Sequence, residues 1–245
     1  MNDELLKVLA SRYETSDFLP ADPSWFIHQV EGDLNREVTA FIASSLSYGS
    51  RKQFFPKIQF VIDSAKGNVY EWVKNRYFDK DIPDSTKCYY RLYTCHTMNM
   101  FLHALSDMIN EHGSIKNFMV SSGVADGLSA VKAITSYFAE KGIETIIPKN
   151  TSSACKRVCM FLRWMVRTDS PVDLGLWCDV IDRRTLIMPM DTHVIQEAVK
   201  LGLMSKASSS MTAAIKLTDK MRDIFPDDPL KGDFALFGYG VDENK

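Results

Sequence analysis

The chain has 245 residues, of which 45% are hydrophobic and 24% charged, and its formal net charge is −2. This composition is ordinary for a globular protein, and the near-neutral charge excludes a surface covered with basic residues, so any contact with nucleic acid must come from a local patch. No apolar run reaches transmembrane length and no signal peptide is evident. The five cysteines, an odd number without a Cys-x-x-Cys spacing, indicate free thiols in a reducing compartment. We therefore expect a cytoplasmic protein that has no membrane contact.

Apolar residues follow a helical period almost throughout the chain, and no strong alternating strand pattern is present, so the predicted fold class is all-α with about ten to twelve helices. The proline-rich stretch 18–25 and the polar stretch 79–87 are expected to be loops, and a brief extended piece is expected at 183–187. The expected helices cover residues 2–14, 33–48, two segments of 54–78 on either side of Gly67, 88–112, the stretch between Gly113 and Gly123, 128–141, a segment that ends at 167, 192–201 and 233–240.

One predicted helix carries a row of basic residues. From Thr145 to Thr168 there are five basic residues and no acidic one. Ser152 and Ser153 are the N-cap candidates, and one face of the helix is apolar (Ala154, Val158, Phe161, Met165, widened by Leu162 and Val166). Lys156, Arg163 and Arg167 fall on the other side. This row is typical of a contact with a phosphate backbone, and the alternative interpretation is a solvated polar face.

Lys156 lies in the first turn of that helix. A cation there faces the positive end of the helix dipole, which costs up to about 1 kcal/mol and lowers the pKa of a lysine. A lysine that attacks carbon must be neutral, so this position favours a nucleophile. The alternative interpretation is an exposed lysine whose stem covers apolar surface.

A second helix is predicted to begin after Asp191. Pro189 precedes this aspartate, which is a natural N-cap for residues 192–201, and Gly202 ends the helix. A capping carboxylate is held rigidly and stays ionised. The same properties are required of a carboxylate that stabilises positive charge on a sugar while its base departs.

The segment Met188–Val194, Met-Pro-Met-Asp-Thr-His-Val, resembles the Pro-Val-Asp-Thr-His-Val segment of the helix-hairpin-helix/Gly-Pro-Asp superfamily of DNA glycosylases. That superfamily includes endonuclease III and the 8-oxoguanine glycosylases. Three further blocks, at residues 33–49, 153–167 and 228–240, more closely resemble an uncharacterised family of bacterial proteins placed in or near this superfamily.

The resemblance implies a two-lobed helical fold around a cleft, with one lobe at residues 33–150 and the other formed by the N-terminal segment and residues 151–245. It implies base excision from damaged duplex DNA, with an oxidised purine as the expected lesion and with or without strand cleavage. Asp191 maps onto the catalytic aspartate of the superfamily. Lys156 is the best match for the lysine that attacks the sugar C1′ in the bifunctional members.

The resemblance also suggests how DNA would be held. Extrusion of a base costs a few kcal/mol, and a wedge side chain offsets part of this cost. Tyr48, Ser50 and Arg51 are the wedge candidates, and the alternative is a helix C-cap at Gly49 followed by a solvated basic turn. Trp177, Phe234, Phe237 and Tyr239 are candidates for stacking on the base, and core packing is the alternative. The expected DNA contacts are Lys149, Asn150, Ser152, Ser153, Arg157, Arg163, Arg167, Arg51, Lys52 and His193.

Three features depart from the superfamily. The Leu-Pro-Gly-Val-Gly hairpin is replaced by residues 147–153, which contain no glycine. Lys156 and Asp191 are 35 residues apart, which exceeds the spacing in endonuclease III but is similar to that in the archaeal 8-oxoguanine glycosylases. No cysteine follows Cys178, so the iron–sulfur pattern is missing, and we expect neither a cluster nor another cofactor.

Two other functions remain open at this point. The chain could be a nucleic-acid-binding protein without catalytic activity on the same scaffold, which the missing hairpin favours. It could instead be a helical metal-dependent hydrolase that uses His96, His103, Asp191 and His193. Cys155 and Cys159, one helical turn apart, are a further possible metal pair. The sequence leaves the lesion, the choice between DNA and RNA, and the oligomeric state undetermined.

Overall fold

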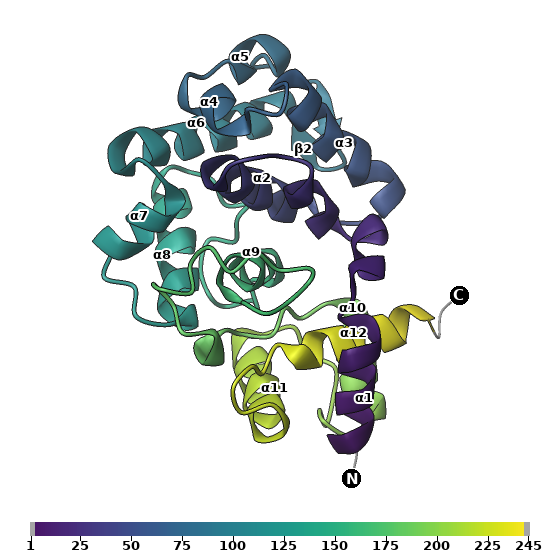
Figure 1. The fold of residues 1–245 in the computed structure, drawn as a ribbon. Helices are drawn as coiled ribbons and strands as arrows, with labels where there is room; N and C mark the ends of the chain where they lie inside the picture. The colour runs from purple at the N-terminus through teal and green to yellow at the C-terminus, as the bar shows by residue number, and fades with distance from the viewer. Residues whose placement is uncertain (1–2, 243–245) are drawn as a thin grey trace. The chain divides into compact units, whose positions relative to one another are not determined.

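A computed structural model describes residues 3–242 of the chain (Figure 1). Within these residues the fold is all-α apart from one two-stranded hairpin, which confirms the predicted fold class. The chain divides into two compact units. Unit 1 contains the segment that ends at Asp22, the segment Ala125–Lys132 and the chain from Asn150 onward, and unit 2 contains Pro23–Val124 and Ala133–Lys149.

Unit 2 is built around the buried helices α2 and α6. Phe41, Phe101 and Phe138 stack on one another with ring centroids 5.4 to 5.9 Å apart. The buried Glu37 caps a neighbouring helix, because its carboxylate accepts hydrogen bonds from the backbone N–H groups of Ile115 and Lys116 at 2.8 and 3.0 Å. The elements of this unit are η2 (Pro23–His28), α2 (Asp33–Leu46), α3 (Arg51–Ser64), α4 (Val69–Lys74), α5 (Phe78–Asp81), β1 (Cys88–Tyr90), β2 (Tyr93–Thr94), α6 (Cys95–His112) and α7 (Ile115–Ser121).

The predicted helix over residues 88–112 is wrong in its first seven residues. Residues 88–94 form an antiparallel hairpin of β1 and β2, in which Cys88 pairs with Thr94 and Tyr90 with Tyr93. Helix α6 begins only at Cys95, because the side chain of Thr94 caps it by accepting from the N–H of Thr97 at 3.1 Å. Tyrosine and threonine favour strands, so this short segment adopts its local preference once a turn is available.

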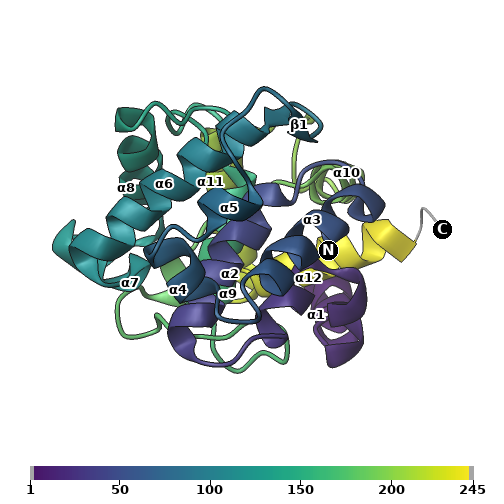
Figure 2. The ribbon, with the colours of Figure 1, turned by 90° about the horizontal axis from the view of Figure 1, so that it is seen from above.

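Two predicted loops contain short helices instead. Residues 16–28 form the 3₁₀-helices η1 (Ser16–Ala21) and η2, with Pro20 inside η1 and Pro23 at the start of η2. The fixed φ of proline is compatible with both positions, and short 3₁₀ segments are common connectors. The predicted polar loop 79–87 overlaps α5. Figure 2 shows α4, α5 and α6 side by side in this unit.

Helix α8 (Gly127–Glu140) contributes its first residues to unit 1 and the rest to unit 2. A Cβ atom at Gly127 would lie 2.5 Å from the carbonyl oxygen of Thr185, so only glycine allows this close approach. Residues around Thr185 form the 3₁₀-helix η3 (Arg183–Thr185), where the sequence predicts an extended piece. No helix among residues 3–242 combines the length and apolar character that a membrane crossing requires.

The remaining helices belong to unit 1, where α12 packs against both α1 and α10. Glycines make these contacts possible: a Cβ atom at Gly238 would clash with the ring of Tyr13, and one at Gly240 would lie 3.0 Å from the side chains of His193 and Glu197. The helices of this unit are α1 (Asp3–Tyr13), α9 (Lys156–Val166), α10 (Thr192–Lys200), α11 (Met211–Ile224) and α12 (Lys231–Asp242). Helix α11 is not predicted from the sequence pattern.

Candidate active site on α9 and α10

Lys156 is the first residue of α9, as predicted, but the helix is not capped by Ser152 or Ser153. The N-cap is Cys155, which is buried and adopts a left-handed backbone conformation with φ 47° and ψ 41°. This conformation is uncommon outside glycine and persists only where the surroundings enforce it. The thiol sulfur lies 3.4 Å from the carbonyl oxygens of Asn150 and Ser153, so the loop before α9 holds Cys155 and thereby Lys156 in place.

Two backbone N–H groups of the loop that precedes α9 are hydrogen-bonded to other atoms of the protein. The N–H of Ser152 donates to the side chain of Asn150 at 2.9 Å, and the N–H of Ala154 donates to the carbonyl of Ser209 at 2.8 Å. These groups therefore do not face outward to hold a phosphate, as the N–H groups of a glycine hairpin would. The side chains of Asn150, Ser152 and Ser153 are exposed, and their role in DNA binding stays a prediction.

Asp191 is the N-cap of α10, which confirms the local prediction. Its Oδ1 accepts a hydrogen bond from the backbone N–H of His193 at 3.0 Å. This bond fixes the rotamer of the carboxylate and leaves Oδ2 available for another partner. That partner is Lys156, whose Nζ donates to Oδ2 at 2.5 Å.

The Lys156–Asp191 pair is partly shielded from solvent. The Lys156 side chain is 35% exposed and the Asp191 side chain 18%. Burial alone would raise the pKa of Asp191, but the Lys156 ammonium, together with the hydrogen bonds from Lys156 and from the His193 N–H, outweighs it, and the pKa lies below the usual value. Asp191 is therefore ionised at neutral pH, and the two helix starts place an amine directly against a carboxylate.

Aromatic side chains surround the start of α10. The His193 ring meets Phe237 edge-on with centroids 5.8 Å apart, and Phe237 in turn contacts Phe18 at 5.9 Å. Phe237 is half-buried and can still be approached by a ligand, as can Tyr239. Trp177 and Phe234 are completely buried, so the prediction that they stack on an extruded base is wrong and their role is core packing. Phe18, which contacts Phe237, is not among the site residues predicted from the sequence.

The prediction that Arg163 and Arg167 contact DNA is also wrong. Both side chains are buried, because α9 is covered on all sides from Val158 onward. Arg167 binds Asp228 with two hydrogen bonds, at 2.7 and 2.8 Å, and this forked geometry suits a guanidinium. We call these side chains the buried arginine network; its carboxylates are Asp173 and Asp233 for Arg163, and Asp173, Asp228 and Glu14 for Arg167.

Asp233 links this network to the candidate site. Its burial raises its pKa to about 6; the contact with Arg163 opposes this shift, and the negative charges of Asp191 and Asp173 reinforce it. Asp233 therefore senses the charge of Asp191. The sequence signal for Asp233 is a single charged residue among the apolar and glycine residues from Gly232 to Val241. A charge at such a position is costly unless it has a buried partner.

Two other predicted DNA contacts near α9 differ in their surroundings. Lys149 is exposed, belongs to unit 2, and forms an ion pair with Glu144 at 2.8 Å. Arg157 follows Lys156 in α9 and is half-buried. Both side chains keep a surface through which a phosphate could be contacted, and both assignments stay predictions.

The predicted wedge residues belong to unit 2, whereas Lys156 and Asp191 belong to unit 1. Helix α2 ends with Ser47 as its C-cap, so the predicted cap at Gly49 is displaced. Tyr48 is 42% exposed and Ser50 is exposed. Arg51 and Lys52 begin α3, where Arg51 is half-buried and Lys52 exposed.

The residues proposed as metal ligands do not come together. His96 contacts Asp84 at 2.7 Å and His103 contacts Asp79 at 2.9 Å. Within residues 3–242, no group of three or more His, Cys, Asp or Glu side chains has the arrangement of a metal site. Neither the four-residue set of the hydrolase alternative nor the Cys155–Cys159 pair therefore forms a ligand shell there.

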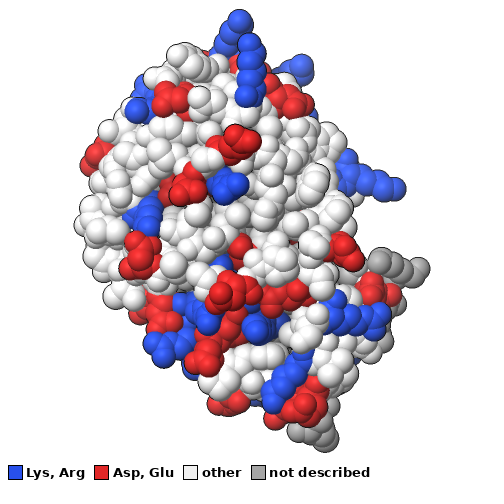
Figure 3. Space-filling model, in the orientation of Figure 1, with Lys and Arg blue, Asp and Glu red and all other residues white. Residues whose placement is uncertain are grey.

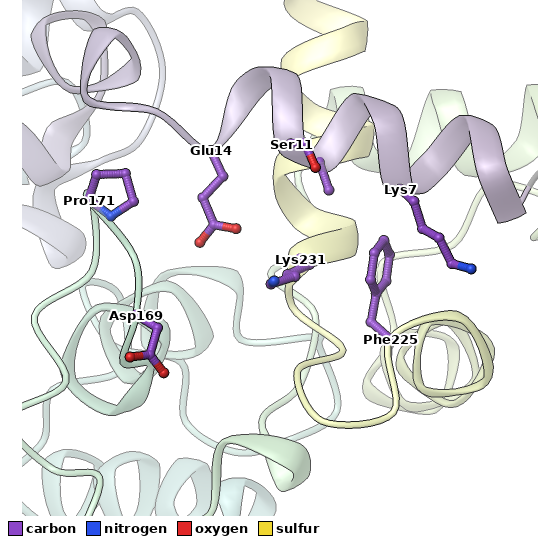
Figure 4. Close-up of a pocket in the computed structure, with 8 residues that line it drawn as sticks. Lys7, Ser11, Glu14, Asp169, Pro171, Phe225 and Lys231 are labelled. Carbon is purple, nitrogen blue, oxygen red and sulfur yellow. The ribbon is translucent and has the colours of Figure 1, made fainter.

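A separate cavity in unit 1 has a volume of about 380 Å³ (Figure 4). Its lining mixes the carboxylates of Glu14 and Asp169 with the amines of Lys7 and Lys231, and it contains neither Lys156 nor Asp191. On the face drawn in Figure 3, acidic and basic side chains are likewise interspersed, and no large region of one sign covers that face. A nucleic-acid contact on this face would therefore have to be local, as the net charge predicts.

The DUF2400 family, described as a protein of unknown function, matches residues 22–242. No curated protein and no solved structure matches the chain. The match includes all of unit 2 and the part of unit 1 between residues 22 and 242, with Lys156, Asp191 and every carboxylate of the buried arginine network except Glu14. The chain therefore belongs to the DUF2400 family.

Proposed function

We propose that the protein is a DNA glycosylase that removes a damaged base and cleaves the strand through a Schiff base with Lys156. The supporting observation is the contact of 2.5 Å between the Lys156 amine and the Asp191 carboxylate, at the starts of two helices and partly open to solvent. A nucleophile and a carboxylate in hydrogen-bond contact are the arrangement that covalent catalysis requires. The resemblance of residues 188–194 to the glycosylase superfamily supplies the substrate class.

In this proposal the ionised Asp191 stabilises positive charge that develops on the sugar as the bond from C1′ to the base breaks and the base leaves with the electron pair. The Lys156 ammonium first loses a proton to water; the resulting neutral amine bonds to C1′ and passes a second proton to the Asp191 carboxylate. Opening of the sugar ring then breaks the C1′–O4′ bond, O4′ takes up a proton, and a C1′=N Schiff base remains. Abstraction of a C2′ proton from this imine eliminates the 3′ phosphate and nicks the strand.

Borohydride trapping tests this chemistry directly, because it reduces the imine to a stable amine. We expect a covalent complex with duplexes that contain 8-oxoguanine or an abasic site, and loss of this complex in Lys156→Gln. Lys216→Gln, which alters an exposed lysine on α11, is the matched control and should trap as the wild type does. Asp191→Asn should reduce base release at least 100-fold, in line with the loss of one well-placed electrostatic stabiliser.

The outcomes separate the alternatives. Base release that requires Asp191 but gives no trapped complex would replace the lyase by a glycosylase that activates water. Salt-sensitive DNA binding without trapping or release would favour the binding protein without catalytic activity. The loop before α9 gives that second function some support, because the N–H groups of Ser152 and Ala154 are already bonded within the protein.

A further inference from the structure

The β1–β2 hairpin carries an exposed apolar side chain at its tip. Leu92 is 79% exposed, which exceeds the exposure of every other large hydrophobic side chain among residues 3–242. It shares a two-residue turn with Arg91, whose backbone is left-handed with φ 51°. Folding leaves this apolar side chain in contact with water, so it is available to a partner outside the chain.

Three tyrosines anchor the hairpin below this tip. Tyr89, Tyr90 and Tyr93 are at most 8% exposed. The Tyr90 hydroxyl donates to the carbonyl of Tyr48, and the Tyr89 hydroxyl donates to the carbonyl of Lys57 at 3.4 Å. The hairpin is therefore fixed against α3 and the turn before it, and its tip is presented without an ordering cost on binding.

The Arg91 side chain packs against the turn between α2 and α3. The Arg91 guanidinium lies over the Tyr48 ring, 4.9 Å from its centroid. Gly49, with φ +89°, makes room for it, because a Cβ atom there would lie 2.5 Å from the Arg91 Nη1. A second cation is placed in the same way, since the Lys57 ammonium lies 5.0 Å from the centroid of the Tyr89 ring. Figures 1 and 2 show the hairpin beside α3.

The charge of this region is mainly positive. Residues 47–62 and 85–94 contain five basic residues and no acidic one. Asp84, the acidic residue immediately before the second segment, is bonded to His96 at 2.7 Å. We call this region the hairpin surface; it consists of Tyr48, Arg51, Lys52, Lys57, Lys87, Arg91 and Leu92.

We propose that the hairpin surface binds duplex DNA, with its basic side chains on phosphates and Leu92 inserted between base steps. Cations fixed on aromatic rings suit a phosphate backbone, and an apolar side chain between them suits the stacked base edges. A charge-free apolar patch would suit a protein partner better, whereas here the hairpin, the segment before it and the start of α3 carry five cations and one highly exposed leucine. This inference rests on the proposed function for its choice of DNA, but it concerns residues of unit 2 that take no part in the Schiff-base chemistry.

Binding of an undamaged fluorescent duplex between 50 and 200 mM KCl tests the cationic part. Each phosphate contact contributes about 0.9 to the slope of log K against log salt. We expect Lys87→Gln and Arg91→Gln each to reduce the slope by about one unit. Lys141→Gln, which alters a lysine of unit 2 paired with Asp107, should leave the slope unchanged. Wild-type slopes in both hairpin variants would overturn the proposal.

A duplex containing 2-aminopurine tests the role of Leu92, because this base fluoresces more when it is unstacked. We expect the wild type to increase the fluorescence and Leu92→Ala to lose most of that increase while keeping the salt slope. Val120→Ala, at an exposed apolar residue of unit 2, is the control and should behave as the wild type. An unchanged signal in Leu92→Ala would overturn insertion, and binding to anionic vesicles in place of DNA would identify a membrane surface instead.

These readouts do not depend on catalysis. Hairpin-dependent DNA binding in a protein that neither traps nor releases a base would uphold the hairpin surface and overturn the proposed chemistry. Trapping that Lys156→Gln abolishes, combined with wild-type slopes in the hairpin variants, would uphold the chemistry and overturn the hairpin surface.

Discussion

At the scale of single residues, the electrostatics of unit 1 depend on carboxylates that the fold removes from water. Asp191 keeps its charge because Lys156 contacts it directly, whereas Asp233 is buried beside other negative charges and has a pKa of about 6. The pKa of Asp191 is thus lowered and the pKa of Asp233 is raised, although the two carboxylates interact. Separated pKa values of this kind are typical of acid–base sites.

The pKa of Asp233 predicts a specific pH dependence of stability. The unfolded value is about 3.9, so between pH 4 and 6 the folded protein holds a proton that the unfolded chain lacks. Stability therefore falls as the pH rises through this window, by about 3 kcal/mol for a shift of two units. Asp233→Asn should lose this contribution. The difference in unfolding free energy between the variant and the wild type should therefore change by about 3 kcal/mol between pH 4 and pH 6. Urea unfolding from pH 4 to 8 measures this difference.

Thr218→Val is the matched control for this experiment, because Thr218 is buried in unit 1 and accepts a hydrogen bond from the N–H of Met188 at 2.9 Å, but its side chain has no titratable group. It should lower stability by the same amount at every pH between 4 and 8. Equal pH profiles for the two variants would contradict the assignment of this titration to Asp233.

At the scale of elements, local sequence information predicted some features and not others. The cap at Asp191 and the position of Lys156 depend on neighbouring residues, and both predictions are confirmed. The periodicity could not predict that Arg163 and Arg167 are buried, because it assumes one apolar face per helix. It also cannot show partner carboxylates that lie 6 to 153 residues away in the sequence. Helix α11 did have a signal, since Ser210 caps it and Met211, Ala214, Leu217 and Met221 form its buried face.

The glycines of α12 give a prediction about packing. Gly238→Ala would drive a methyl group into the ring and Cβ of Tyr13, near the backbone of α1, and we expect a net loss of about 2 kcal/mol. Gly232→Ala meets the flexible Met221 side chain instead, and the gain in helix propensity should offset most of that contact. Thermal unfolding should show a decrease in Tm of about 4–8 °C for the first variant and little change for the second. The opposite order would contradict the packing of α12 on α1.

At the scale of the whole molecule, the five cysteines divide by accessibility. Cys88 and Cys178 are exposed, and Cys95, Cys155 and Cys159 are buried. Burial also raises the pKa of the Cys155 and Cys159 thiols, which reduces their reactivity further. A thiol reagent should therefore modify two residues in the native protein and five after denaturation. Rapid modification of Cys155 would show that the loop before α9 opens in solution.

The buried arginine network has a consequence for the order in which the protein is made. All of unit 2 has been synthesised once residue 149 emerges, so that unit can begin to fold while the ribosome is still at work. Arg163 and Arg167 emerge soon afterwards, but Asp228 and Asp233 come at least 60 residues later. Until then Arg163 in α9 and Arg167 directly after it lack these partners and cannot be buried at low cost. Unit 1 is therefore the last part of the nascent chain to close, and a ribosome stalled before residue 228 would hold α9 open to proteases and chaperones.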